Sequence, residues 1–74
     1  MRRFRDSEGS EWEVVAGRES WGSIYAIFIP VVEGELRQSP IQASGYEAAT
    51  AELERLSEVE LQVMLAQSQP KPMG

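Results

Sequence analysis

The chain of 74 residues is 42% apolar and 26% charged, and its net charge at neutral pH is −5. This length and composition are those of one small globular domain and exclude a chain that is disordered throughout. The absence of cysteine and histidine excludes disulfides, thiolate nucleophiles and zinc sites of the usual type, and it removes the most common general base. The first residues, MRRFRD, are not followed by the apolar core of a signal peptide, and no stretch is long enough to span a membrane. We therefore expect a cytoplasmic protein.

The first eighteen residues predict a β-hairpin. A three-residue loop at residues 7–9, with Gly9 in the left-handed conformation, fixes one register of the two strands. In this register each arginine faces a glutamate and the two aromatic residues face each other; the pairs are Arg3–Glu13, Arg5–Glu11 and Phe4–Trp12. Both faces of the hairpin favour the same register, which supports the prediction.

Residues 23–32, SIYAIFIPVV, form the most apolar stretch, and their many β-branched and aromatic side chains favour a strand. Both alternating rows of this strand are largely apolar. One row contains Ile24, Ala26, Phe28, Pro30 and Val32, and the other contains Tyr25, Ile27, Ile29 and Val31. One row is expected to pack on the helical segment, and the other is either covered by loops or forms an interface. Because a domain this small has little material to cover both faces, the interface is favoured.

A short fourth strand is expected from Glu35 to about Ser39, where Pro40 ends it. A two-residue turn at Glu33-Gly34 would pair Val31 with Leu36. The strand is polar and short, which is typical of a sheet edge.

The segment 44–67 has helical spacing of its apolar residues. It carries two capping-box patterns, Ser44 with Glu47 and Ser57 with Glu60. The second pattern predicts a break at Ser57, and whether one bent helix or two results stays open. Residues 68–74, SQPKPMG, are expected to form a disordered tail. The predicted fold is α+β: a four-stranded antiparallel β-meander with a C-terminal helix or kinked helix pair packed on one face, in one domain spanning 1–67.

The pattern F-x-D-x-x-G-x-x-W-x-V at residues 4–14, followed by Arg18 and by L-S-x-x-E-L at residues 56–61, resembles a group of short, uncharacterised bacterial proteins. These proteins open on such a hairpin and close on such a helix. The resemblance implies the same fold and a bacterial cytoplasmic setting. It implies no catalytic or binding residues, because its motifs are a turn, an aromatic pair and a helix cap.

No arrangement of residues favours an enzyme or a cofactor. The hydroxyl groups lack a histidine or cysteine partner, the only lysine is Lys71 in the expected tail, and no phosphate-binding glycine pattern occurs. Residues 1–6 carry a local charge of +2, so a nucleic-acid-associated protein is the alternative function. Its contacts would be Arg2, Arg3, Arg5 and Arg18. The acidic chain as a whole repels nucleic acid, and the segment 44–69 carries a local charge of −4.

The sequence favours a small, non-enzymatic protein-binding module, which acts as an accessory or regulatory subunit through an apolar sheet face. The expected partner is a protein or a second copy of the chain, with a homodimer as the first expectation. The candidate interface residues are Trp21, Tyr25, Ile27, Ile29, Val31 and Leu36. Trp21, in the loop beside Gly22, either closes the end of the small core, which is the more common role of a loop tryptophan, or is an exposed anchor of an interface.

Overall fold

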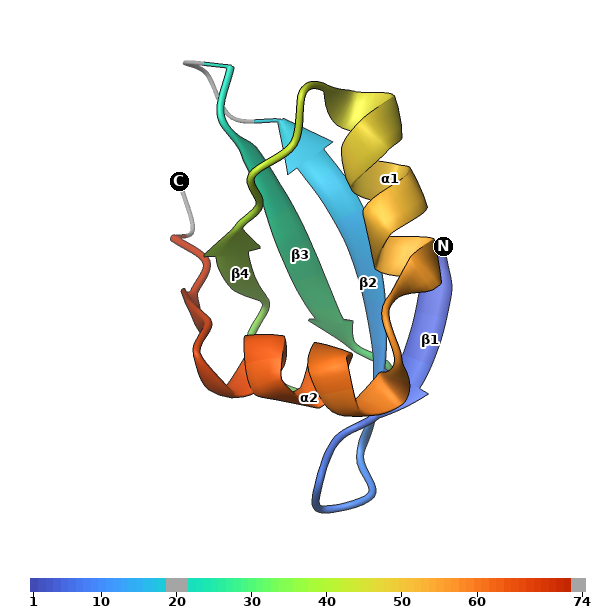
Figure 1. Cartoon of the computed structure of the whole chain (residues 1–74). Coiled ribbons are helices and arrows are strands. Elements are labelled where there is room, and N and C mark those ends of the chain that lie inside the picture. The colour runs from blue at the N-terminus through green and yellow to red at the C-terminus, as the bar shows by residue number, and fades with distance from the viewer. Residues whose placement is uncertain (19–21, 73–74) are drawn as a thin grey trace.

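The computed structural model describes residues 1–18 and 22–72. Five antiparallel strands lie in the order β1-β2-β3-β4-β5, and the two helices lie against one face of this sheet (Figure 1). The elements are β1 (Arg2–Arg5), β2 (Glu11–Arg18), β3 (Ile24–Pro30), β4 (Arg37–Pro40), α1 (Tyr46–Arg55), α2 (Glu58–Ala66) and β5 (Gln69–Pro70). The predicted α+β class and antiparallel meander are confirmed, whereas the prediction of four strands is wrong.

The fifth strand comes from the segment that was expected to be a disordered tail. Arg37 donates to the hydroxyl of Ser68 at 2.8 Å and to its carbonyl oxygen at 2.6 Å, and Ser68 is buried. The backbone N–H of Lys71 donates to the carbonyl of Leu36 at 2.8 Å. The expected disorder is therefore wrong for residues 68–72; residues 73–74 lie outside the described part of the chain. The three polar residues and two prolines of 68–72 have no hydrophobic period, so the sequence pattern did not reveal a strand pairing that Arg37 supports.

The N-terminal hairpin has the predicted register, with Phe4 opposite Trp12. Gly9 has a φ of +86°, as the loop requires. Asp6 holds the loop: its carboxylate accepts from the backbone N–H groups of residues 8 and 10, each at 2.9 Å, and from the indole N–H of Trp12 at 3.0 Å. These bonds, the indole bond above all, hold the pKa of Asp6 below its ordinary value.

The core lies between the sheet and the two helices. Phe28 is fully buried at the centre of β3 and meets Phe4 edge-to-face, with 6.0 Å between the ring centroids. The buried apolar residues are Phe4, Val14, Ala16, Ile24, Ala26, Phe28, Ala49, Leu53, Leu56, Leu61 and Leu65. The row of β3 that begins with Ile24 therefore faces the helices.

The helical segment forms two helices rather than one bent helix. The capping box at Ser57 is confirmed: its hydroxyl accepts from the N–H of Glu60 at 3.1 Å, and the carboxylate of Glu60 accepts from the N–H of Ser57 at 2.9 Å. The first predicted capping box is wrong, because α1 begins one residue later and its N-cap is Gly45. Ser44 then lies outside the helix, and no side chain caps its first turn.

The connection between β3 and β4 also differs from the prediction. The predicted turn would place Gln38 opposite Ile29, but Gln38 pairs with Ile27. Residues 31–36 form a longer connection than a two-residue turn. The predicted pair of Val31 with Leu36 is therefore wrong. None of the helices in the described residues has the length and apolar character that would let it cross a membrane.

Candidate protein-binding face

Within residues 1–18 and 22–72, the sheet has one face that no helix covers, here named the open face. Because side chains alternate along a strand, it carries the residues that lie between the core residues of each strand. Figure 1 shows both helices on the opposite side of the sheet. The open face consists of Arg3, Arg5, Glu11, Glu13, Val15, Gly17, Tyr25, Ile27, Ile29 and Gln38.

An apolar stripe runs along the middle of the open face. It consists of Val15, Tyr25, Ile27, Ile29 and Val31. The N–H of Val31 donates to the carbonyl of Glu11 at 3.1 Å, which extends the β2–β3 ladder by one residue beyond β3. The side chains of Val15, Tyr25, Ile27 and Ile29 are half-buried, and Val31 is 39% exposed. The predicted row of Tyr25, Ile27, Ile29 and Val31 thus lies on one continuous surface.

A glycine shapes the middle of this stripe. A Cβ atom at Gly17 would overlap the Cδ1 atom of Ile27, so the isoleucine side chain extends over the backbone of β2. This close approach brings the apolar surface of β3 next to Val15 on the neighbouring strand. The stripe is therefore wider than one strand.

The charged part of the open face lies over β1 and β2 and is internally balanced. Arg3 forms an ion pair with Glu13 at 2.9 Å and lies 3.9 Å from Glu11, while Arg5 lies 3.7 Å from Glu11. Two arginines thus face two glutamates, as the hairpin register predicted. The open face has no net charge, although the whole chain carries −5. Since these ion pairs are exposed to water, each contributes little to stability.

The edges of the sheet are poor sites for adding a strand. On β1, the N–H of Arg5 donates to Glu58 at 3.2 Å and its carbonyl accepts from the side-chain amide of Gln62 at 2.7 Å. At the other edge, β5 is only two residues long and ends in Pro70. Side chains of α2 and a short proline-containing strand are devices that prevent edge pairing. A protein partner therefore has better access to the open face than to an edge.

A hollow of about 320 Å³ lies at the end of the apolar stripe, between the hairpin loop and the segment after β3. Val32 beside it is 88% exposed. The hollow is lined by Arg5, Gly9, Ser10, Glu11, Trp12, Pro30, Val31, Val32 and Glu33. Apolar side chains thus continue from the stripe into this hollow.

Two predicted interface residues do not join the stripe. Leu36 lies in the connection before β4, half-buried, and its carbonyl accepts the bond from Lys71. Trp21 lies outside the residues that the structure describes. The structure therefore brings together four of the six predicted interface residues: Tyr25, Ile27, Ile29 and Val31.

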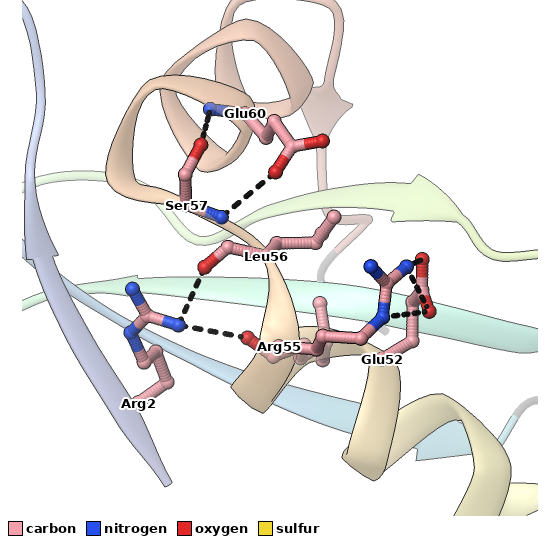
Figure 2. A network of polar contacts seen from close by, with 7 residues as sticks. Arg2, Glu52, Arg55, Leu56, Ser57 and Glu60 are labelled. Carbon is pink, nitrogen blue, oxygen red and sulfur yellow. Dashed lines mark hydrogen bonds and ion pairs between the residues drawn. The ribbon is translucent and has the colours of Figure 1, made fainter.

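The four arginines of the nucleic-acid alternative are not brought together. Arg3 and Arg5 lie on the open face beside glutamates, and Arg18 is exposed at the end of β2. Arg2 points to the helix side and is half-buried. Its guanidinium donates to the carbonyl oxygen of Leu56 at 2.7 Å (Figure 2), and to those of Glu54 at 2.9 Å and Leu53 at 3.3 Å.

The role of Arg2 was missed by the sequence prediction, which left this arginine unpaired. It closes the C-terminal end of α1, where carbonyl groups lack partners within the helix and attract a positive charge. In Figure 2 the Ser57–Glu60 capping box lies directly beyond this contact. Arg2 and Leu56 are 54 positions apart in the sequence, which explains why no local pattern indicated the contact.

In the described parts of the chain, no three acidic side chains lie close enough together to hold a metal ion. Comparisons with protein-family models, with curated proteins and with solved structures find no match to this chain. Its function therefore has to follow from its own surface.

Proposed function

We propose that the chain is a protein-binding module that acts through the open face, as a non-enzymatic accessory or regulatory subunit in the cytoplasm. The main support for this proposal is the apolar stripe, which lies on a sheet face that no described helix covers. Antiparallel sheets that face water normally carry polar side chains on that face. An apolar row in that place favours contact with another protein.

The partner that fits best is a second copy of the chain. The helical segment 44–69 carries a local charge of −4, so copies that meet through the helices repel each other. The open face has equal numbers of arginines and glutamates and imposes no such repulsion. A twofold arrangement would bring one apolar stripe onto the other, as in two sheets packed face to face.

The size of the face is compatible with a stable dimer. The molecule measures 32 × 30 × 19 Å and exposes 5075 Å² in total. The roughly 800 Å² per partner that a standard interface buries is less than a fifth of this surface. The hollow beside Val32 would receive side chains at the end of the stripe.

The test is the solution mass of the wild type and of two lysine variants, measured by size-exclusion chromatography with light scattering across micromolar dilutions. Ile29→Lys places a charge in the stripe, and the monomer tolerates it because Ile29 lies opposite Glu13 on β2. Val63→Lys is the matched control, since it changes an exposed β-branched residue on the helix side.

We expect a dimer for the wild type and for Val63→Lys, and a folded monomer for Ile29→Lys. A wild-type mass of one chain at every concentration would contradict self-association. Equal masses for the wild type and Ile29→Lys, both dimeric, would contradict the assignment of the open face. The nucleic-acid alternative is not carried forward, because Arg2 is engaged at the end of α1 and lies on the side opposite to Arg3 and Arg5.

A further inference from the structure

Helix α2 is apolar on more than one side. Its sequence is EVELQVMLA, and Leu61 and Leu65 are buried in the core. On the opposite side, Val59 is 66% exposed and Val63 is 52% exposed. These two valines are four residues apart, so they are neighbours on the helix surface. They form the outer valine pair of α2, which the core does not use.

Valine is an unusual choice for such positions. Its branched Cβ loses rotamer freedom in a helix, so valine favours helix formation less than alanine, glutamate or lysine does. It also exposes apolar surface to water. Helix α1 exposes mainly charged residues and alanines, namely Glu47, Ala48, Ala51, Glu54 and Arg55, and one large apolar side chain, Tyr46 at its first position. The valine pair is therefore disfavoured both by helix propensity and by hydration in the isolated chain.

The surroundings of the valine pair are acidic. The layer formed by α1 and α2 carries five glutamates, at positions 47, 52, 54, 58 and 60, against the single arginine Arg55. Arg55 is paired with Glu52 at 2.7 Å, and Glu54 lies 3.5 Å from the amino group of Met1. Glu58 and Glu60 accept backbone N–H bonds, which leave their negative charge in place.

Two arginines of β1, Arg2 and Arg5, have atoms close to this layer. The guanidinium of Arg2 points into the junction between the helices, where it bonds carbonyl oxygens, and the backbone of Arg5 lies beside Glu58. The side chain of Arg5 is directed to Glu11 on the open face. The rim of the valine pair is therefore negative on the side of the first turn of α2.

We infer that the outer face of α2 is a second docking surface, for a different protein that presents apolar side chains flanked by lysines or arginines. Such a segment would cover Val59 and Val63 and place its positive charges against Glu60 and the acidic helix layer. In this arrangement the partner contacts an exposed apolar helix face, with charge complementarity at the rim. A second copy of the chain is a poor occupant, because its own α2 carries the same negative charge.

The inference goes beyond self-association through the open face. The two surfaces lie on opposite sides of the molecule and differ in charge. One would join two copies, and the other would hold a basic partner. A dimer would then present two acidic, apolar helix faces on its outside.

The test uses two synthetic peptides of the same length and leucine pattern, one with lysines and one with glutamates at all other positions. Binding of each labelled peptide is measured by fluorescence anisotropy at low and high salt. The key variant is the double substitution Val59→Gln/Val63→Gln, which keeps a good helix former at both exposed sites. The matched control is Ala48→Gln/Ala51→Gln on the exposed side of α1.

We expect the wild type and the α1 control to bind the lysine peptide roughly tenfold more tightly than the α2 variant does, and to bind the glutamate peptide only weakly. Higher salt should weaken the lysine complex. Equal binding by the wild type and the α2 variant would overturn the inference, because the contact would then be purely electrostatic. Absence of lysine-peptide binding to the wild type would overturn it as well. The variant Ile29→Lys should bind like the wild type, which separates this surface from the open face.

Discussion

Replacement of Arg2 by methionine tests how the N-terminal strand holds the helices. Methionine keeps the unbranched apolar stem but removes every donor from the end of α1. We expect the free energy of unfolding to fall, because the carbonyl oxygens of Glu54 and Leu56 lose their charged partner. The carbonyl oxygens of Leu53 and Leu56 are only partly exposed to water.

The magnitude follows from the geometry. The bonds at 2.7 and 2.9 Å are of normal length, whereas the contact with Leu53 at 3.3 Å is long. A hydrogen bond to a charged group contributes roughly 1.5–3 kcal/mol when buried. Arg2 is half-buried and the Glu54 carbonyl is exposed, so water replaces part of this interaction. We therefore expect a loss of about 1.5 kcal/mol, and a smaller loss for Arg2→Lys, whose single ammonium still faces a helix C-terminus.

The assay is urea unfolding at fixed protein concentration, followed by tryptophan fluorescence and by circular dichroism. Fixed concentration matters because association shifts apparent stability. A loss of this size lowers the melting temperature of such a small domain by about 6–12 °C. A change within about 0.5 kcal/mol for Arg2→Met, the range of an ordinary surface substitution, would refute the reasoning. So would equal losses for Arg2→Met and Arg2→Lys.

Three further predictions concern the hairpin, the open face and the C-terminal strand. The variant Asp6→Asn should be less stable than the wild type above about pH 4. The difference in stability should disappear as the pH falls through the lowered pKa of Asp6, and urea unfolding at several pH values measures it. Gly17→Ala should cost less than about 1 kcal/mol in urea unfolding, because the overlapping atom is the terminal methyl group of the half-buried Ile27, and the cost should be smaller still in an Ile27→Val background, which lacks that methyl group. Arg37→Met removes both donors to the buried serine before β5, so amide hydrogen exchange in the segment 68–72 should accelerate while the core amides stay protected.

Each of these predictions has a contradicting outcome. A pH-independent difference for Asp6→Asn would mean that the carboxylate charge is not what holds the loop. Additive costs for Gly17→Ala and Ile27→Val would mean that the two residues do not share the same space. Unchanged exchange in Arg37→Met would mean that β5 is held by its strand pairing alone.

The hairpin was predictable from the sequence because two independent patterns favoured the same register. The cross-strand charges of Arg3 and Glu13 and the aromatic pair of Phe4 and Trp12 both fail if the strands slip by one residue. The capping box at Ser57 was also predictable, because its two bonds join residues that are three apart. Local chemistry of this kind is complete within a short stretch of sequence.

Contacts between distant segments were not predictable in the same way. Strand β5 depends on Arg37, and the end of α1 depends on Arg2, and neither contact has a periodic signature. The sequence also indicated the two rows of β3 without showing which one faces the helices, because alternation fixes rows but not their direction. In the candidate site, Leu36 was misplaced because the register of β3 with β4 depends on a connection longer than a tight turn.

The central claim is that the open face is a protein-binding surface, and methyl NMR tests it most directly. A soluble paramagnetic probe is added to concentrated and to dilute protein, and the broadening of the methyl signals of Ile27 and Ile29 is compared with that of Val59. The proposed dimer predicts that the isoleucine methyl groups are protected at high concentration and become accessible on dilution, while Val59 stays accessible throughout. Isoleucine methyl groups that are equally accessible at every concentration would contradict the claim that the open face is buried by a second copy.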